Sequence, residues 1–386
     1  MIVHNGSKYM TTNLETHRPK VIDLFAGAGG MTEGLRKAGF HSILANEYDV
    51  MAGVTFKANH PNVPLIIKDV KDLSVDEVLQ LANLKVGELS MISGGPPCQG
   101  FSLAGPRLDG DPRNQMFKEF VRLVNGLRPE LFLFENVSGI MSMSGGSVLR
   151  AIVAEFTAVG YKCEYSLLSA ADYGVPQARP RFILIGVRDN VSVGFPDPTH
   201  GNAVASRSLF TANLKPLLTV WDALSDLPVI YQGQGEEELM HSGVYHNEYQ
   251  EDRRGERRPG VIFNHRATKH SDIIVNRYAA IPEGGNNSQV PIELRTKKIN
   301  VFKLDSQRPS RTVTCNHRTD LLHPRVPRGT TVREAARLQS FDDDYQFFGN
   351  LTRKARWVTQ DDQVGNAVPP LLAKALGEHI KRRMQW

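Results

Sequence analysis

The chain has 386 residues, of which 41% are hydrophobic and 23% are charged, so it is long enough for two lobes and too ordinary in composition for wholesale disorder. It has no run of about 20 apolar residues, and we expect neither a transmembrane helix nor, in the polar segment 1–12, a secretory signal. A net charge of +5 permits nucleic-acid binding without demonstrating it.

The three cysteines, Cys98, Cys163 and Cys315, are odd in number and far apart. A disulfide framework is therefore not expected, and a reducing, cytoplasmic setting fits the composition. Cys315 and His317 supply only two metal-ligand side chains, which is too few for a zinc site, so we expect no metal.

Strand-length apolar runs alternate with helical patterns over the first 190 residues. We predict strands at 21–25, 42–45, 89–92, 131–134, 161–168 and 181–187, and helices at 31–38, 116–124 and 148–158. Gly39 is a suitable end for the first helix. The alternation predicts an α/β fold with a mostly parallel sheet covered by helices on both faces.

The pattern changes after about residue 189. Residues 192–328 have short apolar runs, many Gly, Pro, Asn and His residues, and clustered arginines, which favours a smaller, loop-rich second domain over 191–354. A helix is predicted at 332–341, where Thr331 and Glu334 have the spacing of a capping box. A last helix at 370–383 places 355–386 with the first domain, 1–190.

The first candidate site is the glycine-rich turn over 23–30, between a strand and a helix, where a ligand can approach the backbone. The dinucleotide fingerprint fails because Thr32 occupies the position of its third glycine. Glu47 follows the next strand and could accept two ribose hydroxyls, and Asp69 could receive an adenine amino group. Together they indicate a nucleoside cofactor without a pyrophosphate, although a tight structural turn and two solvated strand ends remain open alternatives.

The second candidate site is Cys98, which follows Pro96 and Pro97 in a loop just past a predicted strand. Loops at the carboxyl ends of strands are where open α/β sheets place ligands and nucleophiles. A lone cysteine is more often a small buried hydrophobe, and we give that interpretation to Cys163 and Cys315.

Two further candidates carry charge. Glu135 ends an apolar strand, so its carboxyl group could have a raised pKa and act as a general acid. Arg179 and Arg181 alternate on an extended chain and could hold phosphates or steady a carboxylate. Each could instead be a solvated edge residue.

At this point the chain resembles the DNA (cytosine-5) methyltransferase family. Six blocks resemble those of the family and occur in its order over about residues 20–380: 23–30, 94–102 with Pro97-Cys98, Glu135-Asn136-Val137, Gln177 to Arg181, 333–341 and 363–370. The chain departs from the family at Lys68-Asp69-Val70, where Gly-Asp-Ile is frequent, at Thr330 in place of leucine and at Asp342 in place of proline.

The resemblance implies a Rossmann-like AdoMet-dependent methyltransferase sheet, with a target-recognition domain in the variable region. It also implies S-adenosyl-L-methionine (AdoMet) as the cofactor. The expected cofactor-binding residues are Asp23, Phe25, Ala26, Gly27, Gly29, Gly30, Glu47, Tyr48, Asp69, Val70, Pro97, Met116, Asn366 and Ala367.

The resemblance further implies that Cys98 attacks carbon 6 of a flipped-out cytosine, that Glu135 protonates its N3 edge and that Arg181 contacts O2 and steadies Glu135. Asn136 is expected to hold the Pro-Cys loop, and Arg179 belongs to the same catalytic set. The expected DNA-binding residues are Gln99, Ser102, Arg113, Gln177, Asn264, Arg266 and Arg311.

The expected partner is double-stranded DNA, and we expect a cytoplasmic monomer with no membrane association. A cognate restriction endonuclease acting on the same site is an open possibility. The alternatives are a tRNA cytosine-5 methyltransferase on the same scaffold and a catalytically silent DNA-binding protein. The long region 192–328 favours duplex DNA, because a sequence reader needs an additional domain, and an intact set of Cys98, Glu135 and Arg181 argues against a silent protein. A dehydrogenase is not favoured, because Thr32 breaks the dinucleotide-binding fingerprint.

Overall fold

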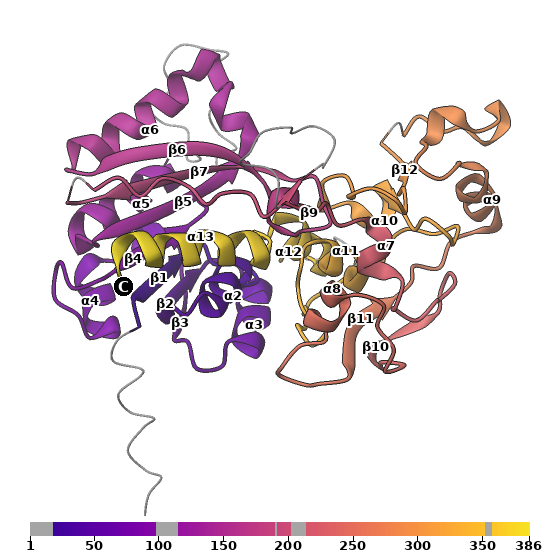
Figure 1. Cartoon of the computed structure of the whole chain (residues 1–386), viewed down its shortest axis with the longest axis horizontal. Coiled ribbons are helices and arrows are strands. Elements are labelled where there is room, and N and C mark those ends of the chain that lie inside the picture. Colours follow the sequence, from indigo (N-terminus) through magenta and orange to yellow (C-terminus); the bar gives the residue numbers. More distant parts are fainter. Residues whose placement is uncertain (1–17, 98–114, 190, 202–213, 299, 352–356) are drawn as a thin grey trace, which may run out of the picture.

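The structure is a computed structural model, which describes residues 18–97, 115–189, 191–201, 214–298, 300–351 and 357–386. Its centre is a seven-stranded sheet with the order β3-β2-β1-β4-β5-β7-β6 (Figure 1). The strands are β1 (Lys20–Leu24), β2 (His41–Glu47), β3 (Leu65–Ile67), β4 (Met91–Gly94), β5 (Leu131–Val137), β6 (Lys162–Ser169) and β7 (Pro180–Val187). In this sheet β7 runs opposite to the other six strands, which confirms the predicted mostly parallel α/β fold.

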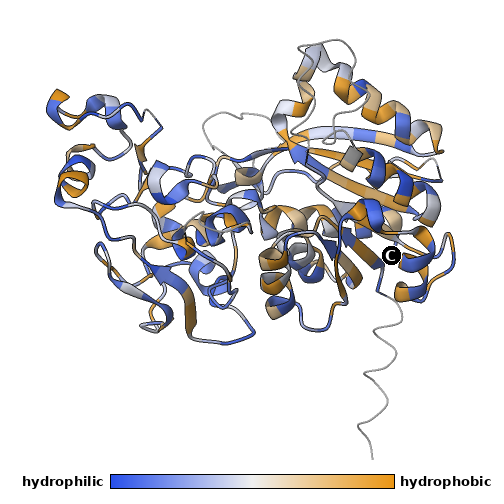
Figure 2. Ribbon diagram, turned by 180° about the vertical axis from the view of Figure 1, so that it is seen from behind, coloured by the Kyte–Doolittle hydropathy of each residue, from blue (hydrophilic) through white to orange (hydrophobic). Residues whose placement is uncertain are grey.

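Helices cover both faces of the sheet. On one face, α4 (Val75–Ala82), α5 (Gln115–Leu127) and α6 (Ser147–Ala158) bury an aromatic cluster that includes Phe120, Phe132 and Phe156. On the other face lie α2 (Gly30–Lys37) and α13 (Pro370–Met384), and α3 (Val50–Asn59) packs beside β2 and β3. Figure 2 shows the hydrophobic strands enclosed between these helices.

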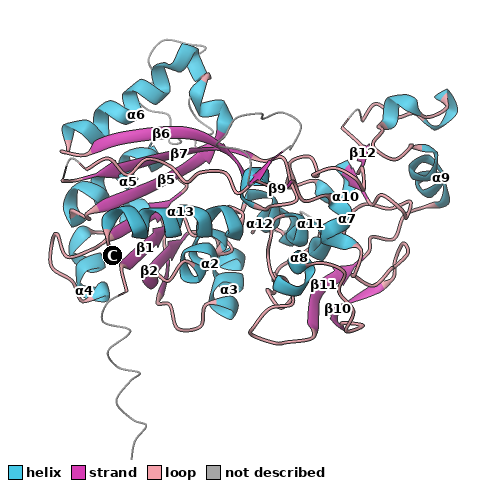
Figure 3. Cartoon of the chain, in the orientation of Figure 1, coloured by secondary structure: helices cyan, strands magenta, loops and turns pink. Residues whose placement is uncertain are grey.

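The part of the chain after β7 is dominated by loops (Figure 3). Its strands are β8 (His200–Gly201), β9 (Lys215–Pro216), β10 (Gly235–Met240), β11 (Val261–Arg266), β12 (Phe302–Lys303) and β13 (Leu321–Leu322). Its helices are α7 (Val220–Leu224), α8 (Glu248–Asp252), α9 (Asp272–Ala280), α10 (His317–Asp320) and α11 (Val332–Leu338), and α12 (Gln360–Asn366) leads back to α13. Val193 is still buried in the core on the sheet, so packing gives no sharp break at residue 191, and the domain boundaries remain a prediction.

The helix α11 connects the two parts. Its capping box of Thr331 and Glu334 forms as predicted, but the helix ends at Leu338 rather than at 341, because Ser340 adopts a left-handed φ of 67°. The helix and the segment after it, through Tyr345 and Phe347, share a hydrophobic core with Ala28 of the glycine-rich turn. The loop-rich part therefore packs directly behind the first candidate site.

Two departures from the family pattern have clear partners here. The carboxylate of Asp342 lies 2.6 Å from the Lys37 ammonium on α2 and 3.3 Å from the Arg253 guanidinium. The hydroxyl of Thr330 lies 3.0 Å from Nδ1 of His317. Both residues therefore make polar contacts where the usual leucine and proline would make none with their side chains.

None of the described helices is long and apolar enough to cross a membrane.

Candidate active site

The turn after β1 has the backbone shape that a ligand cradle requires. Phe25, Gly27 and Gly29 adopt positive φ angles of 56°, 56° and 93°. A Cβ atom added to Gly27 would meet no atom within 4 Å, whereas one added to Gly30 would clash with the Val368 carbonyl. One side of the turn is therefore packed against the protein, and the Gly27 side is open for a ligand to approach the backbone.

Glu47 faces this turn from the end of β2. Its carboxylate accepts hydrogen bonds from the backbone N–H groups of Gly27 at 2.7 Å, Asp49 at 2.8 Å and Tyr48 at 2.9 Å. Burial raises the pKa of Glu47, and these three donors oppose the rise. The contacts fix a carboxylate at the edge of the open turn, where the sequence predicts a ribose acceptor.

The other predicted adenosine ligands border the same edge. Tyr48 is 56% exposed, and just after β3 the carboxylate of Asp69 accepts from the Lys71 amide at 3.0 Å. The side chain of Val70 is buried in the sheet core, so only its backbone could meet a cofactor. The turn also brings Ala26 close to the end of β2, because its N–H donates to the Asn46 carbonyl at 3.0 Å.

Asp23 lies behind the turn, so its role toward the cofactor stays a prediction. Its side chain is only 1% exposed, and its carboxylate accepts from the Thr32 hydroxyl and, at 2.9 Å, from the Ser93 hydroxyl. Burial raises the pKa of Asp23 to about 6. The side chain therefore braces the turn, and Thr32, which breaks the dinucleotide fingerprint, supplies one of its partners.

The remaining predicted cofactor residues come from three other elements. Pro97 is exposed after β4, and Met116 is half-buried at the start of α5. Asn366 is exposed at the end of α12, where its carbonyl oxygen accepts from the Cys315 thiol at 3.2 Å, and Ala367 follows it. The contact between Val368 and Gly30 brings this segment against the glycine-rich turn.

Glu135 lies at the end of β5, with 8% of its surface exposed. Its Oε1 atom is 2.9 Å from Nε of Arg181 on β7, and its other carboxylate oxygen faces Gly95. Burial raises the pKa of this carboxyl group, and Arg181 opposes the rise. The pair is therefore the carboxylate with a steadying arginine that the sequence predicts.

The next residue holds the neighbouring loop. The amide of Asn136 donates to the Pro96 carbonyl at 2.8 Å, and its Oδ1 accepts from the Val137 amide at 2.9 Å. This is the contact expected of Asn136, and it fixes a peptide two residues before Cys98. Cys98, Gln99, Ser102 and Arg113 lie outside the described residues.

Gln177 and Arg179 do not have the predicted surroundings. Both side chains are fully buried. Gln177 accepts from the Val313 amide at 2.8 Å, and Arg179 donates to the carbonyls of Val313 at 2.7 Å and Gly365 at 2.6 Å. In this structure the side chain of Gln177 is occupied by backbone contacts, and Arg179 joins two segments of the chain; their roles toward DNA and substrate stay predictions.

Of the predicted DNA contacts in the loop-rich part, one side chain is buried and two are exposed. Asn264 is buried, and its side-chain amide donates to the Phe347 carbonyl at 2.9 Å while its side-chain oxygen accepts from the Phe347 amide at 2.9 Å. Its contact with DNA stays a prediction. Arg266 and Arg311 are exposed. The guanidinium of Arg311 stacks over the Phe302 ring at 3.9 Å, which leaves a cation on the surface.

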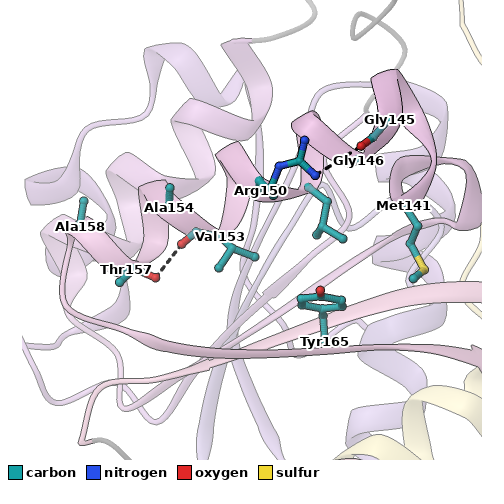
Figure 4. A pocket seen from close by; sticks show the side chains of 10 residues that line it. Met141, Gly145, Gly146, Arg150, Val153, Ala154, Thr157, Ala158 and Tyr165 are labelled. Atoms are coloured by element: carbon teal, nitrogen blue, oxygen red, sulfur yellow. Dashed lines mark hydrogen bonds between the residues drawn. The ribbon is translucent and has the colours of Figure 1, made fainter.

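A cavity of about 830 Å³ lies away from all these residues, between α6 and the edge strand β6 (Figure 4). Its wall is mostly apolar and includes Met141, Leu149, Val153 and Tyr165. Four inter-strand steps separate β6 from β1, a distance of about 19 Å. The cavity contains none of the predicted site residues and is separate from the glycine-rich turn.

Sequence reasoning missed the residues that support the turn from behind. His60 and Tyr345 meet there although 285 positions separate them in the chain. His60 follows an ordinary helix and Tyr345 lies in a loop, so no local sequence pattern indicates that the two side chains meet.

The comparisons with known proteins agree with this geometry. The family model for C-5 cytosine-specific DNA methylase matches residues 19–382. The chain is 39% identical to the Type II methyltransferase M.DdeI of Desulfomicrobium norvegicum, over 93% of this chain and 88% of that protein. It is 35% identical to the Type II methyltransferase M1.HphI of Haemophilus parahaemolyticus, over 93% and 86% of the two chains.

Among solved structures, a putative DNA modification methyltransferase encoded within an Escherichia coli prophage superposes with a TM-score of 0.75 at 29% identity, and the match covers 95% of this chain and 100% of that one. The sheet, its order and its helices are thus those of the AdoMet-dependent methyltransferase fold. The chain belongs to the C-5 cytosine-specific DNA methylase family and is a DNA cytosine-5-methyltransferase.

Proposed function

We propose that this enzyme transfers a methyl group from AdoMet to carbon 5 of a cytosine that is flipped out of a short, specific duplex sequence. The observation that carries the proposal is the alignment of three strand ends. Leu24 of β1 pairs with Gly94 of β4, and Gly94 pairs with Phe134 of β5. The cofactor turn, the Pro-Cys loop and Glu135 therefore begin within about 10 Å of one another, since neighbouring strands are about 4.8 Å apart.

The residues around the turn fit the methyl donor. Gly27 leaves open space beside the backbone. Glu47 would bind the ribose hydroxyls and Asp69 would receive the adenine amino group, because Glu47 ends β2 and Asp69 follows the adjacent strand β3 by two residues. Phe25 and Tyr48 offer rings at the same edge, and Pro97, Met116 and Asn366 would close the pocket. When bound, AdoMet supplies an electrophilic methyl group on its sulfonium.

The chain's own residues would prepare the base. Carbon 5 of cytosine is a poor nucleophile, so the Cys98 thiolate would first add to carbon 6, forming a C–S bond and an enamine. Glu135 would donate a proton to N3 as negative charge develops there, and Arg181 would hold that carboxyl group and contact O2. After methyl transfer, a base removes the C5 proton and the C–S bond breaks, which returns the electron pair to Cys98.

The base must leave the helix for these groups to reach it, because carbons 5 and 6 are stacked in duplex DNA, and this costs a few kcal/mol. We propose that Arg266 and Arg311 contact DNA from the loop-rich part and that Gln99, Ser102 and Arg113 do so from the loop after β4. Arginines of this kind mostly touch phosphates, so binding should weaken steeply as salt increases.

The relatives named above are Type II methyltransferases, which supports a restriction-modification role for this chain. We therefore propose a cognate restriction endonuclease that cuts the same sequence, with no direct complex required, and a monomeric methyltransferase.

A trapping experiment tests the covalent step without knowledge of the target sequence. A library of random duplexes made with 5-fluorodeoxycytidine is incubated with the enzyme and AdoMet. Because fluorine cannot leave as a proton does, elimination stops and a complex stable to denaturation should form, with the adduct at Cys98 by mass spectrometry. Cys98→Ser should form none. Wild-type enzyme that methylates ordinary DNA but is never trapped would contradict the covalent step.

The same measurement separates the tRNA alternative. A parallel incubation with tRNA that contains 5-fluorocytidine should give no adduct, whereas trapping on tRNA alone would favour the RNA substrate.

A further inference from the structure

Two buried rings support the glycine-rich turn from the side opposite its open face. Tyr345 is fully buried, and its hydroxyl donates to the Ala28 carbonyl. Nε2 of His60, at the end of α3, lies 3.1 Å from that hydroxyl. A Cβ atom added to Gly29 would lie 2.7 Å from the Tyr345 hydroxyl and 2.8 Å from the His60 Nε2. The turn therefore rests directly on these two side chains.

The direction of each hydrogen bond follows from donor counting. The Ala28 carbonyl can only accept, so the single proton of the Tyr345 hydroxyl points to it. The hydroxyl oxygen is then left to accept, and we assign Nε2–H of His60 as its donor, the tautomer that this arrangement favours. Burial lowers the pKa of His60 to about 4, so the ring is neutral at pH 7 and has this single N–H. The chain of donors runs from His60 through Tyr345 to Ala28.

The same pair is anchored by the loop-rich part of the molecule. Arg257, which follows α8, forms an ion pair with the buried Glu33 of α2 and lies over the Tyr345 ring with its guanidinium carbon 5.2 Å from the ring centre. Asn59, next to His60, donates to the Gln346 carbonyl at 2.8 Å and accepts from the Gln346 amide at 3.0 Å. Tyr345 is therefore held from both parts.

We propose that Tyr345 and His60 are positioning residues for the methyl donor. They fix the Ala28 carbonyl and hence the direction in which the amides of the glycine-rich turn face AdoMet, without touching it. This inference rests on AdoMet being the ligand of the turn, as proposed above. A turn that already has its ligand-binding conformation loses less conformational entropy when AdoMet binds. Loss of the Tyr345 hydroxyl should therefore weaken AdoMet binding.

The test compares two tyrosines. Tyr345→Phe removes the hydroxyl and leaves the ring, and the dissociation constants of AdoMet and S-adenosylhomocysteine should rise about tenfold, as measured by calorimetry on the full chain. At saturating AdoMet, kcat and the KM for DNA should stay within about twofold of wild type, since the variant affects only the donor site.

Tyr249→Phe is the matched control. Tyr249 is also buried in the same hydrophobic cluster, and its hydroxyl also donates to a backbone carbonyl, that of Arg337. The Tyr249→Phe variant should lower the melting temperature by about as much as Tyr345→Phe does, but it should leave the affinity for AdoMet unchanged. A Tyr345→Phe enzyme with wild-type AdoMet affinity, or a Tyr249→Phe enzyme equally weakened, would overturn the positioning role.

His60 provides a second, conservative test. His60→Gln can present an N–H near the position of Nε2, whereas His60→Leu presents none, so AdoMet affinity should be retained more fully in the glutamine variant. Equal affinity losses in both would contradict the donor chain. A wild-type enzyme that binds neither AdoMet nor S-adenosylhomocysteine would instead refute the proposed function itself, which is a distinguishable result.

Discussion

Glu135 shows how one buried carboxyl group can be prepared for acid catalysis. Desolvation favours its protonated form, while Arg181 at 2.9 Å keeps it oriented and limits the rise in its pKa. A carboxyl group that keeps its proton above its ordinary pKa can donate that proton when charge develops on a bound base. Its position at the end of β5, next to the Pro-Cys loop, gives the group its direction.

Glu135→Gln should therefore lower kcat about 100-fold or more, because a carboxamide of the same shape cannot deliver the proton. AdoMet affinity should change little, since the turn after β1 is two strands away. The check is methyl transfer from tritiated AdoMet to unmethylated DNA, with calorimetry for the cofactor. A glutamine variant with kcat near wild type would remove Glu135 from the acid role.

The variant Asn136→Asp tests the hydrogen bond by which Asn136 holds the Pro-Cys loop. An aspartate still accepts from the Val137 amide but places a carboxylate oxygen against the Pro96 carbonyl, where the amide now donates. We expect kcat to fall about tenfold, the equivalent of a lost buried hydrogen bond. The kcat of Asn136→Ala should lie between those of the wild type and Asn136→Asp. An aspartate variant that is only less stable, with unchanged kcat, would assign Asn136 to folding alone.

The places of side chains at strand ends could be predicted from the sequence, as with Glu47, Glu135 and Arg181. The surroundings of a polar side chain could not be predicted where the backbone of a distant segment binds it. Gln177 and Asn264 have the groups to read base edges, and the sequence cannot show that the amides and carbonyls of Val313 and Phe347 already occupy them. Asp23 was missed as a brace because Ser93 is 70 residues away.

At the scale of single elements, α11 and the turn before it place three arginines entirely inside the protein, Arg333 and Arg337 from the helix and Arg328 from the turn. Arg328 pairs with Glu334, Arg333 donates to backbone carbonyls, and Arg337 pairs with Asp343 at 2.5 Å and Asp226 at 3.0 Å. A buried charge of this kind is tolerated only when its partners are all in place. The helix therefore fixes the path of the loops around it.

Arg337→Leu should lower the free energy of unfolding by about 3–5 kcal/mol, because two buried carboxylates lose a fully buried cationic partner; among the described residues, Asp226 keeps only the less buried Arg254 as an ion-pair partner, and Asp343 keeps only His241. The matched control is Arg258→Ala, which breaks an exposed pair with Glu238 and should cost less than about 1 kcal/mol. Urea unfolding of both variants provides the measurement. Equal losses would show that the buried network does not stabilise this region.

Some helices could be predicted from the sequence, and others could not. Strongly periodic segments such as 116–124 and 148–158 are helices as predicted. The helix α3 went unpredicted because its apolar residues surround it instead of forming one stripe, although Asp49 caps it. The end of α11 differs because tertiary contacts hold Ser340 left-handed, with its hydroxyl accepting from the Leu371 amide at 3.1 Å.

Across the whole molecule, two buried neutral histidines should make the free energy of unfolding fall in acid. Burial lowers the pKa of His60, which faces Glu33, Arg36 and Arg257, and of His323, which faces Glu334 and Arg328, to about 4 each, from 6.5. Below pH 6.5 the unfolded chain therefore takes up protons that the native state does not. Asp23, with its pKa raised to about 6, opposes part of this loss.

Between pH 6.5 and 5 each histidine should contribute a loss of about 2 kcal/mol. His60→Gln should therefore lose about 2 kcal/mol less stability over this range than the wild type. The check is urea unfolding at both pH values. Identical pH dependence in the two proteins would show that His60 titrates normally in the native state.

The central claim, that this chain methylates cytosine through Cys98 at one sequence, is tested most directly by mapping 5-methylcytosine in the DNA of a methylation-deficient bacterial host. The host expresses either the wild-type chain or its Cys98→Ala variant, and immunoblotting confirms equal soluble amounts. We predict modification at carbon 5 of one cytosine within one short motif, with the wild type only. Unmodified DNA in cells that contain soluble, AdoMet-binding enzyme, or equal modification by Cys98→Ala, would contradict the claim.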